Sequence, residues 1–559
     1  LFQAISKVNM KKSNQCQRSS KILNCILFSI CFIGLNSTNV LAQDEMKFHN
    51  RYENYVNELK RFPCKDVIMF SGQNGLKPYS LFIHSAKISS LLKNTYETAS
   101  LNKLIQSTLE TRKISVVHRS WGTFVQAANF VSPDIASQTN YDAIWLRDSV
   151  WAYLALDSQH QETSQQDAHQ VLLTLWDYLS TPEQLKRMKA VIANPSLLTG
   201  AEGQMMAPHI RFDSKSSHFA DIMVDGKPQS WTHKQNDALG LLIDTVLQNI
   251  EIGKINTQEW NQDNRLKALI YLVGYFDKAQ FYQMEDSGAW EEALRLNTSS
   301  IALVTSALEN MLKLVQHPNE KEEGFVRALQ KKAQALSMSQ VISQENLLRL
   351  VDLGYKRIDK QLSLGGESPD YKNVDSRYRK ADAALLNLIY PAQLKRLTIK
   401  QKEQVLNIVA PLMGDIGIRR YFNDNYQSAN FWFHNIKTDT DSKSYEERLK
   451  QFVPGSEAQW FFDSWYAKSA LIVYKENRNP YYWALAVRSM NRALSQITGE
   501  YMKGADGQPV QGNSLPESYN FIAHKGQLWE SPSPITPLNW SKASMTLMFH
   551  EFSKILISK

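Results

Sequence analysis

Apolar side chains recur at the 3.6-residue spacing of an amphipathic helix in one segment after another of this 559-residue chain. In residues 234–250 the shared face consists of Leu239, Leu242, Ile243, Val246, Leu247 and Ile250. The same spacing recurs in residues 144–157, 166–180, 262–279, 291–317, 343–361, 380–390, 400–412, 457–475, 481–496 and 540–557. Glycine (23) and proline (18), which interrupt helices, are scarce. The pattern predicts an all-α protein of about a dozen helices.

Two arrangements of such helices fit the pattern. One is an open α-solenoid, although the chain shows no self-similarity at the fixed period of about 34–45 residues that such repeats have. The other is a closed α/α barrel, in which the long segments between alternate helices gather at one end and can form a pocket. Periodicity alone does not separate the two.

The first residues have the composition of a targeting segment. Residues 1–9 precede the first methionine, and we assign them no role. Residues 10–42 comprise a basic start, an apolar run too short to span a membrane of about 30 Å, and a Val-Leu-Ala end. They predict a signal peptide cleaved after Ala42, the alternative being an N-terminal anchor helix. We expect a secreted or periplasmic protein without membrane attachment after cleavage.

Removal of this leader changes what charge and cysteine content imply. It takes away five basic residues and lowers the formal net charge from +8 to +3, and no basic patch indicates a nucleic-acid partner. Of the four cysteines only Cys64 remains, which excludes an intramolecular disulfide and a cysteine-based zinc site. The 12 histidines show no HExxH spacing. We therefore expect no metal and no cofactor.

Five segments at the ends of predicted helices combine aromatic, acidic and amide side chains. They are residues 141–149, 230–240, 290–292, 376–382 and 514–520. Read singly, the first two are helix N-terminal caps, the third is an acidic first turn of the helix predicted for 291–317, and the last two are solvated stretches. Glu291 beside Trp290 could instead have the raised pKa that a general acid needs. No nucleotide-binding loop and no GxSxG nucleophile elbow competes with this chemistry.

Taken in order, these segments resemble glycoside hydrolase family 15, the glucoamylases. The matching residues are Tyr141 with Trp145, Arg147, Asp148 and Ser149; Ser230, Trp231, Gln235 and Asp237; Trp290, Glu291 and Glu292; Arg420, Tyr421, Asp424 and Tyr426; Ser514, Glu517, Tyr519 and Asn520; and Trp540 with Ser541. The resemblance covers about residues 120–555, most of the predicted mature chain. Arg377 fits only by spacing, Asp382 is shifted by one position, and Ala293, Leu294 and Arg295 replace a glycine-containing stretch.

The resemblance implies an (α/α)6 barrel over residues 121–559, with residues 43–120 as a mixed extension that packs on it. It also implies inverting exo-hydrolysis of α-1,4-glucans (starch, glycogen and malto-oligosaccharides) with release of β-glucose. Glu291 would be the general acid and Glu517 the general base, with carboxyl groups about 6.5–9.5 Å apart to admit a water molecule.

The resemblance further assigns a set of substrate-binding residues. These are Tyr141, Trp145, Arg147, Asp148, Trp231, Glu292 and Arg377. The expected partner is an α-glucan or oligosaccharide, and the expected form is a monomer. Two alternatives remain: another α-glucosidase of this family, acting on trehalose or on isomalto-oligosaccharides and dextran, and a non-catalytic glucan-binding barrel.

Overall fold

A computed structural model describes residues 66–128, 140–200, 202–320, 322–428, 449–450 and 452–557. The predicted signal peptide, its cleavage after Ala42, and Cys64 lie outside these residues. Within the described ranges, no helix is both long and apolar enough to cross a membrane.

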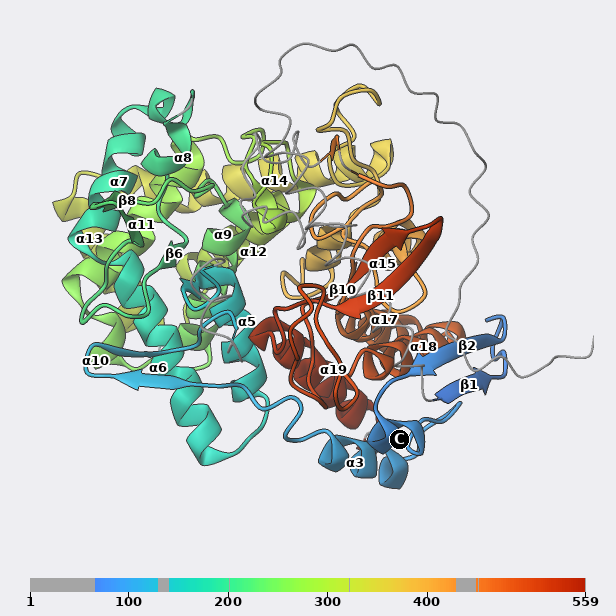
Figure 1. The fold of residues 1–559 in the computed structure, drawn as a ribbon. Coiled ribbons are helices and arrows are strands. Elements are labelled where there is room, and N and C mark those ends of the chain that lie inside the picture. Colours follow the sequence, from blue (N-terminus) through green and yellow to red (C-terminus); the bar gives the residue numbers. More distant parts are fainter. Residues whose placement is uncertain are drawn as a thin grey trace, which may run out of the picture.

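Six elements form a closed inner ring in this part of the chain (Figure 1). They are α5 (Leu146–Asp157), α9 (Asn236–Glu251), α12 (Thr298–Gln316), the short 3-10 helix η4 (Ala383–Leu388), α17 (Asp463–Asn477) and α19 (Asn539–Ile557). Each contacts the next, and α19 contacts α5. Because the ring closes, the chain is the predicted α/α barrel and not an open solenoid.

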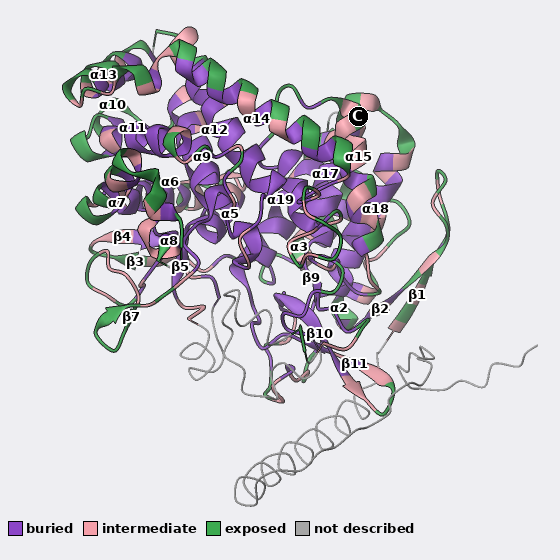
Figure 2. Cartoon of the chain, turned by 90° about the horizontal axis from the view of Figure 1, so that it is seen from above, coloured by how far each residue is buried: buried purple, intermediate pink, exposed green. Residues whose placement is uncertain are grey.

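Six outer helices alternate with the inner elements along the described chain. They are α3 (Thr98–Ser107), α6 (Glu162–Leu179), α11 (Asp263–Lys278), α14 (Gln344–Leu364), α15 (Ile399–Val409) and α18 (Pro480–Ser495). Figure 2 shows the inner helices buried, whereas α14 exposes one side to solvent. The alternation gives six helix pairs, as an (α/α)6 barrel requires.

Smaller helices and strands lie outside the twelve elements of the barrel. Among them are the helices α7 (Pro182–Ala193) and α13 (Glu322–Ala335) and the hairpin of β1 (Asp66–Phe70) and β2 (Tyr79–Ile83). The others are α2 (Ala86–Ser89), β3 (Val117–Arg119), β4 (Gly122–Phe124), β5 (Ile144–Trp145), η1 (Pro195–Leu198), α8 (Gly203–Met206), β6 (Arg211–Phe212), β7 (Met223–Val224), β8 (Lys227–Pro228), α10 (Thr257–Trp260), η3 (Ser339–Ile342) and η5 (Ala410–Leu412). The outer helix α3 packs against α19, and β2 packs against α18.

The segments that carry Glu291 and Glu517 differ from the sequence expectation, and the helix predicted for 380–390 is only the short 3-10 helix η4. The helix predicted for 291–317 begins only at Thr298, because Glu291 ends the 3-10 turn η2 (Gly288–Trp290) with a left-handed backbone (φ 58°) that an α-helix cannot include. The loop around Glu517 leads into a hairpin of β10 (Ser518–His524) and β11 (Gln527–Pro532), and β10 also pairs with β9 (Gln459–Trp460). The left-handed turn thus fixes the position of Glu291, and the hairpin fixes the position of Glu517.

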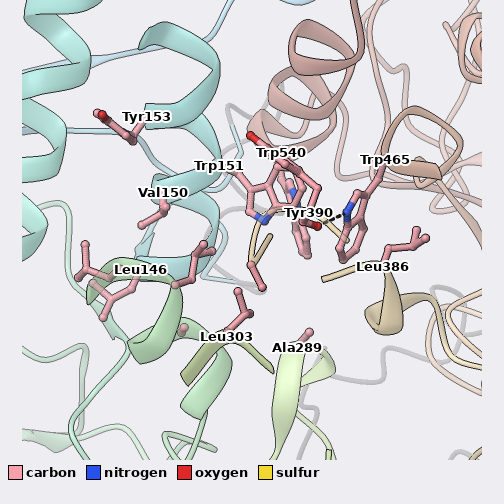
Figure 3. Packing of buried hydrophobic residues seen from close by; sticks show 14 of the residues in the cluster. Leu146, Val150, Trp151, Tyr153, Ala289, Leu303, Leu386, Tyr390, Trp465 and Trp540 are labelled. Atoms are coloured by element: carbon pink, nitrogen blue, oxygen red, sulfur yellow. Dashed lines mark hydrogen bonds between the residues drawn. The ribbon is translucent and has the colours of Figure 1, made fainter. Parts of the chain in front are cut away.

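An aromatic cluster fills the middle of the ring (Figure 3). The buried rings of Trp151 and Trp465 meet edge to face with their centroids 5.2 Å apart. The indole N–H of Trp465 donates to the carbonyl oxygen of Tyr390 (2.7 Å), and Trp540 packs against both tryptophans. Rings of this size bury about 150–250 Å² each, so the cluster closes the barrel axis with a rigid apolar plug.

The inner elements all begin at the same end of the barrel, because an outer helix returns the chain to that end before each of them. The segments that precede them therefore gather at that end. Residues at the starts of α5 and α19 line one pocket there, together with Trp231 from the segment before α9 and Glu291 from the segment before α12. This end is where the predicted functional segments converge.

Candidate active site

A pocket opens at this end of the barrel, with an empty volume, including its mouth, of about 600 Å³. Seven of the nine predicted site residues line it: Tyr141, Trp145, Arg147, Asp148, Trp231, Glu291 and Glu517. Other lining residues are Ala127, Ala289, Trp290, Arg420, Tyr426, Trp460, Leu538 and Trp540. Both predicted catalytic carboxyls thus reach one cavity from segments that are far apart in the sequence.

Glu291 is held by donors from two neighbouring segments. Its side chain is buried, and Arg147 Nη2 donates to Oε1 (3.0 Å) while Trp231 Nε1 donates to Oε2 (2.9 Å). The left-handed backbone at Glu291 ends the η2 turn at this point, and Thr232 donates to its main-chain carbonyl (3.2 Å). Each carboxyl oxygen therefore has a fixed position at the pocket wall.

Glu517 is held by a different pair of donors. The hydroxyl of Tyr141 donates to Oε1, and Gln427 Nε2 donates to Oε2 (2.6 Å). Burial raises the pKa of Glu517 to about 7, although these two hydrogen bonds and the nearby Arg420 act in the opposite direction. Glu517 can therefore exchange a proton near neutral pH.

Arg147 and Asp148 are adjacent in the sequence and form an ion pair, with 3.8 Å between Arg147 Nε and Asp148 Oδ2. Arg147 Nη1 donates to Gln235 Oε1 (2.9 Å) and Asp237 Oδ2 (3.3 Å), which fixes the guanidinium beside Glu291. Burial raises the pKa of Asp148 to about 6, while Arg147 lowers it. Asp148 presents a carboxyl acceptor to the pocket, as recognition of a hydroxyl group requires.

Aromatic rings form much of the pocket wall. The guanidinium of Arg211 lies 3.3 Å from the centroid of the Trp231 ring, which clamps that indole in place. Within the part of the chain that the structure describes, the buried indole N–H groups of Trp460 and Trp540 have no hydrogen-bond partner. The aromatic rings thus give the pocket flat apolar faces, which suit the C–H faces of a sugar ring.

Glu292 and Arg377 do not line this pocket. Glu292 is buried behind it, where it accepts hydrogen bonds from Arg420 Nη2 (2.7 Å) and the Tyr421 hydroxyl (2.7 Å). Burial alone would raise its pKa, but the guanidinium groups around it lower the pKa to about 2. Arg377 is 40% exposed and pairs with Asp375 (2.8 Å) and Glu285 (3.1 Å). In this structure both side chains are occupied by protein partners.

Several pocket residues were not singled out from the sequence. Arg420 bridges Asp424 (2.6 Å) and Glu292 (2.7 Å) at the wall of the pocket, and Tyr426 also lines it. Both belong to the R-Y-x-x-D-x-Y match, so the signal was present. Trp540 belongs to the Trp540-Ser541 match, whereas no motif in the sequence marked Trp460. Among the described residues there is no group of three or more His, Cys, Asp or Glu that could hold a metal ion.

The chain is similar in sequence to two proteins and distantly similar in fold to several solved structures. No family model matches the chain. The chain is 50% identical over 209 residues to YgeQ of Escherichia coli K12, described as an uncharacterized lipoprotein. The aligned region covers 37% of this chain and 78% of YgeQ. The chain is also 44% identical over 102 residues to YgeP of the same organism, described as a putative protein. This aligned region covers 18% of this chain and 100% of YgeP.

Two solved structures illustrate the distant likeness in fold. A glucoamylase from Saccharomycopsis fibuligera superposes with a TM-score of 0.48 and 14% identity, over 83% of this chain and 97% of that one. A glycoside hydrolase family 15 glucoamylase from Hypocrea jecorina gives a TM-score of 0.47 and 14% identity, over 81% of this chain and 73% of that one.

Proposed function

The chain belongs to the same family as YgeQ and YgeP of Escherichia coli, and from its pocket we propose that it is an inverting glycoside hydrolase acting on α-glucosides. The observation that carries the proposal is the pair of buried carboxyls, Glu291 and Glu517, which line one pocket and are held by separate sets of donors. The ordered motifs that resemble glycoside hydrolase family 15 support the same reaction.

In this reaction Glu291 is the general acid. Its proton passes to the glycosidic oxygen as the bond from that oxygen to the anomeric carbon breaks, so the leaving sugar departs as a neutral hydroxyl. The hydrogen bonds from Arg147 and Trp231 fix both carboxyl oxygens and so set the direction from which the proton arrives.

Glu517 is the general base. Its carboxylate removes a proton from a water molecule as the water oxygen bonds to the anomeric carbon on the face opposite the leaving group. An α-linked glucose is thereby released as the β-anomer. Tyr141 and Gln427 each donate to one oxygen of Glu517 and favour the ionised form, whereas burial disfavours it. We therefore expect the ionisation of Glu517 to set one limb of the pH–activity profile near pH 7.

The pocket shape favours cleavage at a chain end. Trp540 belongs both to the pocket wall and to the aromatic plug that closes the barrel axis, so the cavity ends there instead of continuing through the barrel. We propose that one terminal glucose enters, with Asp148 accepting from its hydroxyls and the indole N–H of Trp460 donating to them. The preferred substrate would be an α-1,4-glucan.

A panel of linkages tests this proposal. Maltotriose, trehalose and isomaltotriose are incubated with the protein, released glucose is quantified, and the first anomer is identified by NMR before mutarotation. Faster release from trehalose or isomaltotriose would assign one of the other α-glucosidase activities. Binding of these sugars without any hydrolysis would assign the non-catalytic barrel, and α-glucose as the first product would contradict inversion.

A location outside the cytoplasm fits this activity. YgeQ is described as a lipoprotein, and residues 10–42 of this chain have the composition of a signal peptide. We propose that the protein is exported and cleaved after Ala42. N-terminal sequencing of the mature protein should begin at Gln43, whereas a lipid-modified N-terminus would instead show attachment to a membrane.

A further inference from the structure

Gln427 donates to Glu517 through a side-chain amide that has two possible orientations. The residue is buried, and its backbone is left-handed (φ 54°), a conformation that is uncommon outside glycine, asparagine and aspartate. Its Nε2 donates to Glu517 Oε2 (2.6 Å). If the amide turned by 180°, its oxygen would face Glu517 instead and would repel an ionised carboxylate. The direction of this hydrogen bond therefore depends on the groups that hold the other end of the amide.

Two side chains of β10 hold the oxygen end of this amide. Ser518 and Asn520 are two residues apart on the strand, so their side chains lie on the same face. Ser518 Oγ (2.9 Å) and Asn520 Nδ2 (3.2 Å) are both within hydrogen-bond distance of Gln427 Oε1. The hydroxyl of Ser518 can donate or accept and so fits either orientation, whereas the amide nitrogen of Asn520 can only donate. Asn520 therefore decides which end of the Gln427 amide faces β10.

A main-chain carbonyl in turn fixes the amide of Asn520. Asn520 Nδ2 also donates to the main-chain oxygen of Gln427 (2.6 Å), an atom that can only accept. If the Asn520 amide turned, two oxygen atoms would face each other at this distance. The orientation that avoids this clash leaves Asn520 Oδ1 buried and without a hydrogen-bond partner in the part of the chain that the structure describes. The contact with the backbone of Gln427 thus sets the orientation of Asn520.

We propose that Asn520 is a positioning residue for the base, because it fixes the orientation of Gln427 and so makes that amide a permanent donor to Glu517. The proposal rests on the proposed role of Glu517 as general base, and Asn520 itself does not line the pocket. Tyr141 and Gln427 supply the hydrogen bonds that lower the pKa of Glu517 against the effect of burial. The hydroxyl of Tyr141 can rotate and accept, but an amide held by Asn520 can only donate, so Gln427 consistently favours the ionised carboxylate.

Loss of Asn520 makes the turned orientation of the Gln427 amide available. In that orientation the amide oxygen accepts a hydrogen bond from a protonated Glu517, and the amide nitrogen donates to the hydroxyl of Ser518. The neutral form of the Glu517 carboxyl is then stabilised, which raises its pKa. This change reaches Glu517 from a side chain that acts through Gln427.

The pH dependence of unfolding measures the pKa of Glu517 without a substrate. Urea unfolding is followed from pH 5 to pH 10 for the full chain and for the same chain with Glu517→Gln. Because the pKa is raised in the folded protein, the wild type loses stability relative to Glu517→Gln as the pH rises, and the loss levels off near that pKa, about 7. Unfolding needs no sugar, so a chain that hydrolyses no glucoside would refute the proposed function and leave this test intact.

A double-mutant cycle shows whether Asn520 acts through Gln427. Gln427→Met removes the donor and should move the levelling-off point upwards by about 1–2 pH units, as expected for a hydrogen bond to a charged group. Asn520→Leu should move it in the same direction by up to the same amount, but should add nothing in the Gln427→Met background. The limb of the kcat/KM profile for maltotriose that Glu517 sets should shift in parallel. The matched control is Asn491→Leu, because Asn491 is also buried and donates to a main-chain carbonyl, that of Lys93 (2.8 Å), but does not line the pocket.

An unchanged pKa of Glu517 in Asn520→Leu would overturn the proposal, and so would a shift that persists undiminished in the Gln427→Met background. An equal shift in Asn491→Leu would also overturn it, because general loosening of the fold would then be the cause. If Asn520→Leu does not fold, Asn520→Ser provides the test. It retains a small polar side chain but loses the amide donor, so the pKa of Glu517 should again rise, and an unchanged pKa would refute the role of Asn520.

Discussion

Removal of the Tyr141 hydroxyl should move the pH dependence of catalysis. This hydroxyl donates to Glu517, and a donated hydrogen bond stabilises the ionised carboxylate and lowers its pKa. In Tyr141→Phe the opposing effect of burial remains, so the pKa of Glu517 should rise above its value of about 7. A hydrogen bond to a charged group contributes about 1.5–3 kcal/mol, which corresponds to a rise of about 1–2 pH units.

The measurement is kcat/KM for maltotriose from pH 5 to pH 10. At pH 6 the wild-type base is about one-tenth ionised, and a rise of about 1–2 units reduces this fraction by a further factor of about 10–100. Above pH 9 the loss should become much smaller. Tyr426→Phe is the matched control, because its hydroxyl lies 3.4 Å from that of Tyr141, whereas the hydrogen bonds that lower the pKa of Glu517 come from Tyr141 and Gln427.

A uniform loss of kcat/KM at every pH would refute this reasoning. Such a result would mean that Tyr141 contacts the substrate without influencing the protonation of Glu517. An equal shift in Tyr426→Phe would show that the effect arises from general disturbance of the pocket.

Three further predictions concern the two carboxyls. Glu291→Gln should lower the turnover of maltose by about 10²–10⁴-fold but retain activity on α-glucosyl fluoride, because fluoride leaves without a proton donor. Glu517→Gln should lose activity on both substrates. Equal losses for the two variants on the fluoride would contradict the assigned roles. Trp231→Phe removes the indole donor to Glu291 and should lower kcat by about tenfold with the fold intact, and an unchanged kcat would show that this hydrogen bond has no catalytic role. The folded-state pKa of Glu517 lies above its ordinary value, so its ionisation destabilises the fold as the pH rises through about 7. In urea unfolding at pH 8.5, Glu517→Gln should therefore be more stable than the wild type by up to about 3 kcal/mol, whereas at pH 5 the gain should be small. A gain of equal size at both pH values would show that the ionisation of Glu517 is not its cause.

The sequence predicted the helices better than the positions of individual side chains. Periodicity located α9, α14 and α19 to within a few residues, because burial of one face leaves a regular apolar pattern. It also placed the start of α12 seven residues too early, since nothing in the Trp-Glu-Glu segment reveals a left-handed backbone at Glu291. Local conformation of this kind depends on tertiary contacts, here the donors that reach Glu291 from α5 and from the segment before α9.

The arginine assignments show the same limit. Arg377 was chosen by its spacing from an apolar pair, yet its neighbours Asp375 and Glu285 hold it at the surface. Arg420, part of a motif already matched, reaches the pocket and neutralises Glu292. Sequence spacing cannot show which arginine has a buried acid to pair with, because that acid comes from a different helix pair of the barrel.

Closure of the ring has a consequence for when the protein becomes active. Tyr141, ahead of the first inner helix, meets Glu517, ahead of the last, and this contact exists only once α19 has docked on α5. A growing chain that has emerged as far as α18 holds Glu291 but lacks the residue proposed to activate water. The proposed reaction therefore requires that α19 has been synthesised and has docked on α5.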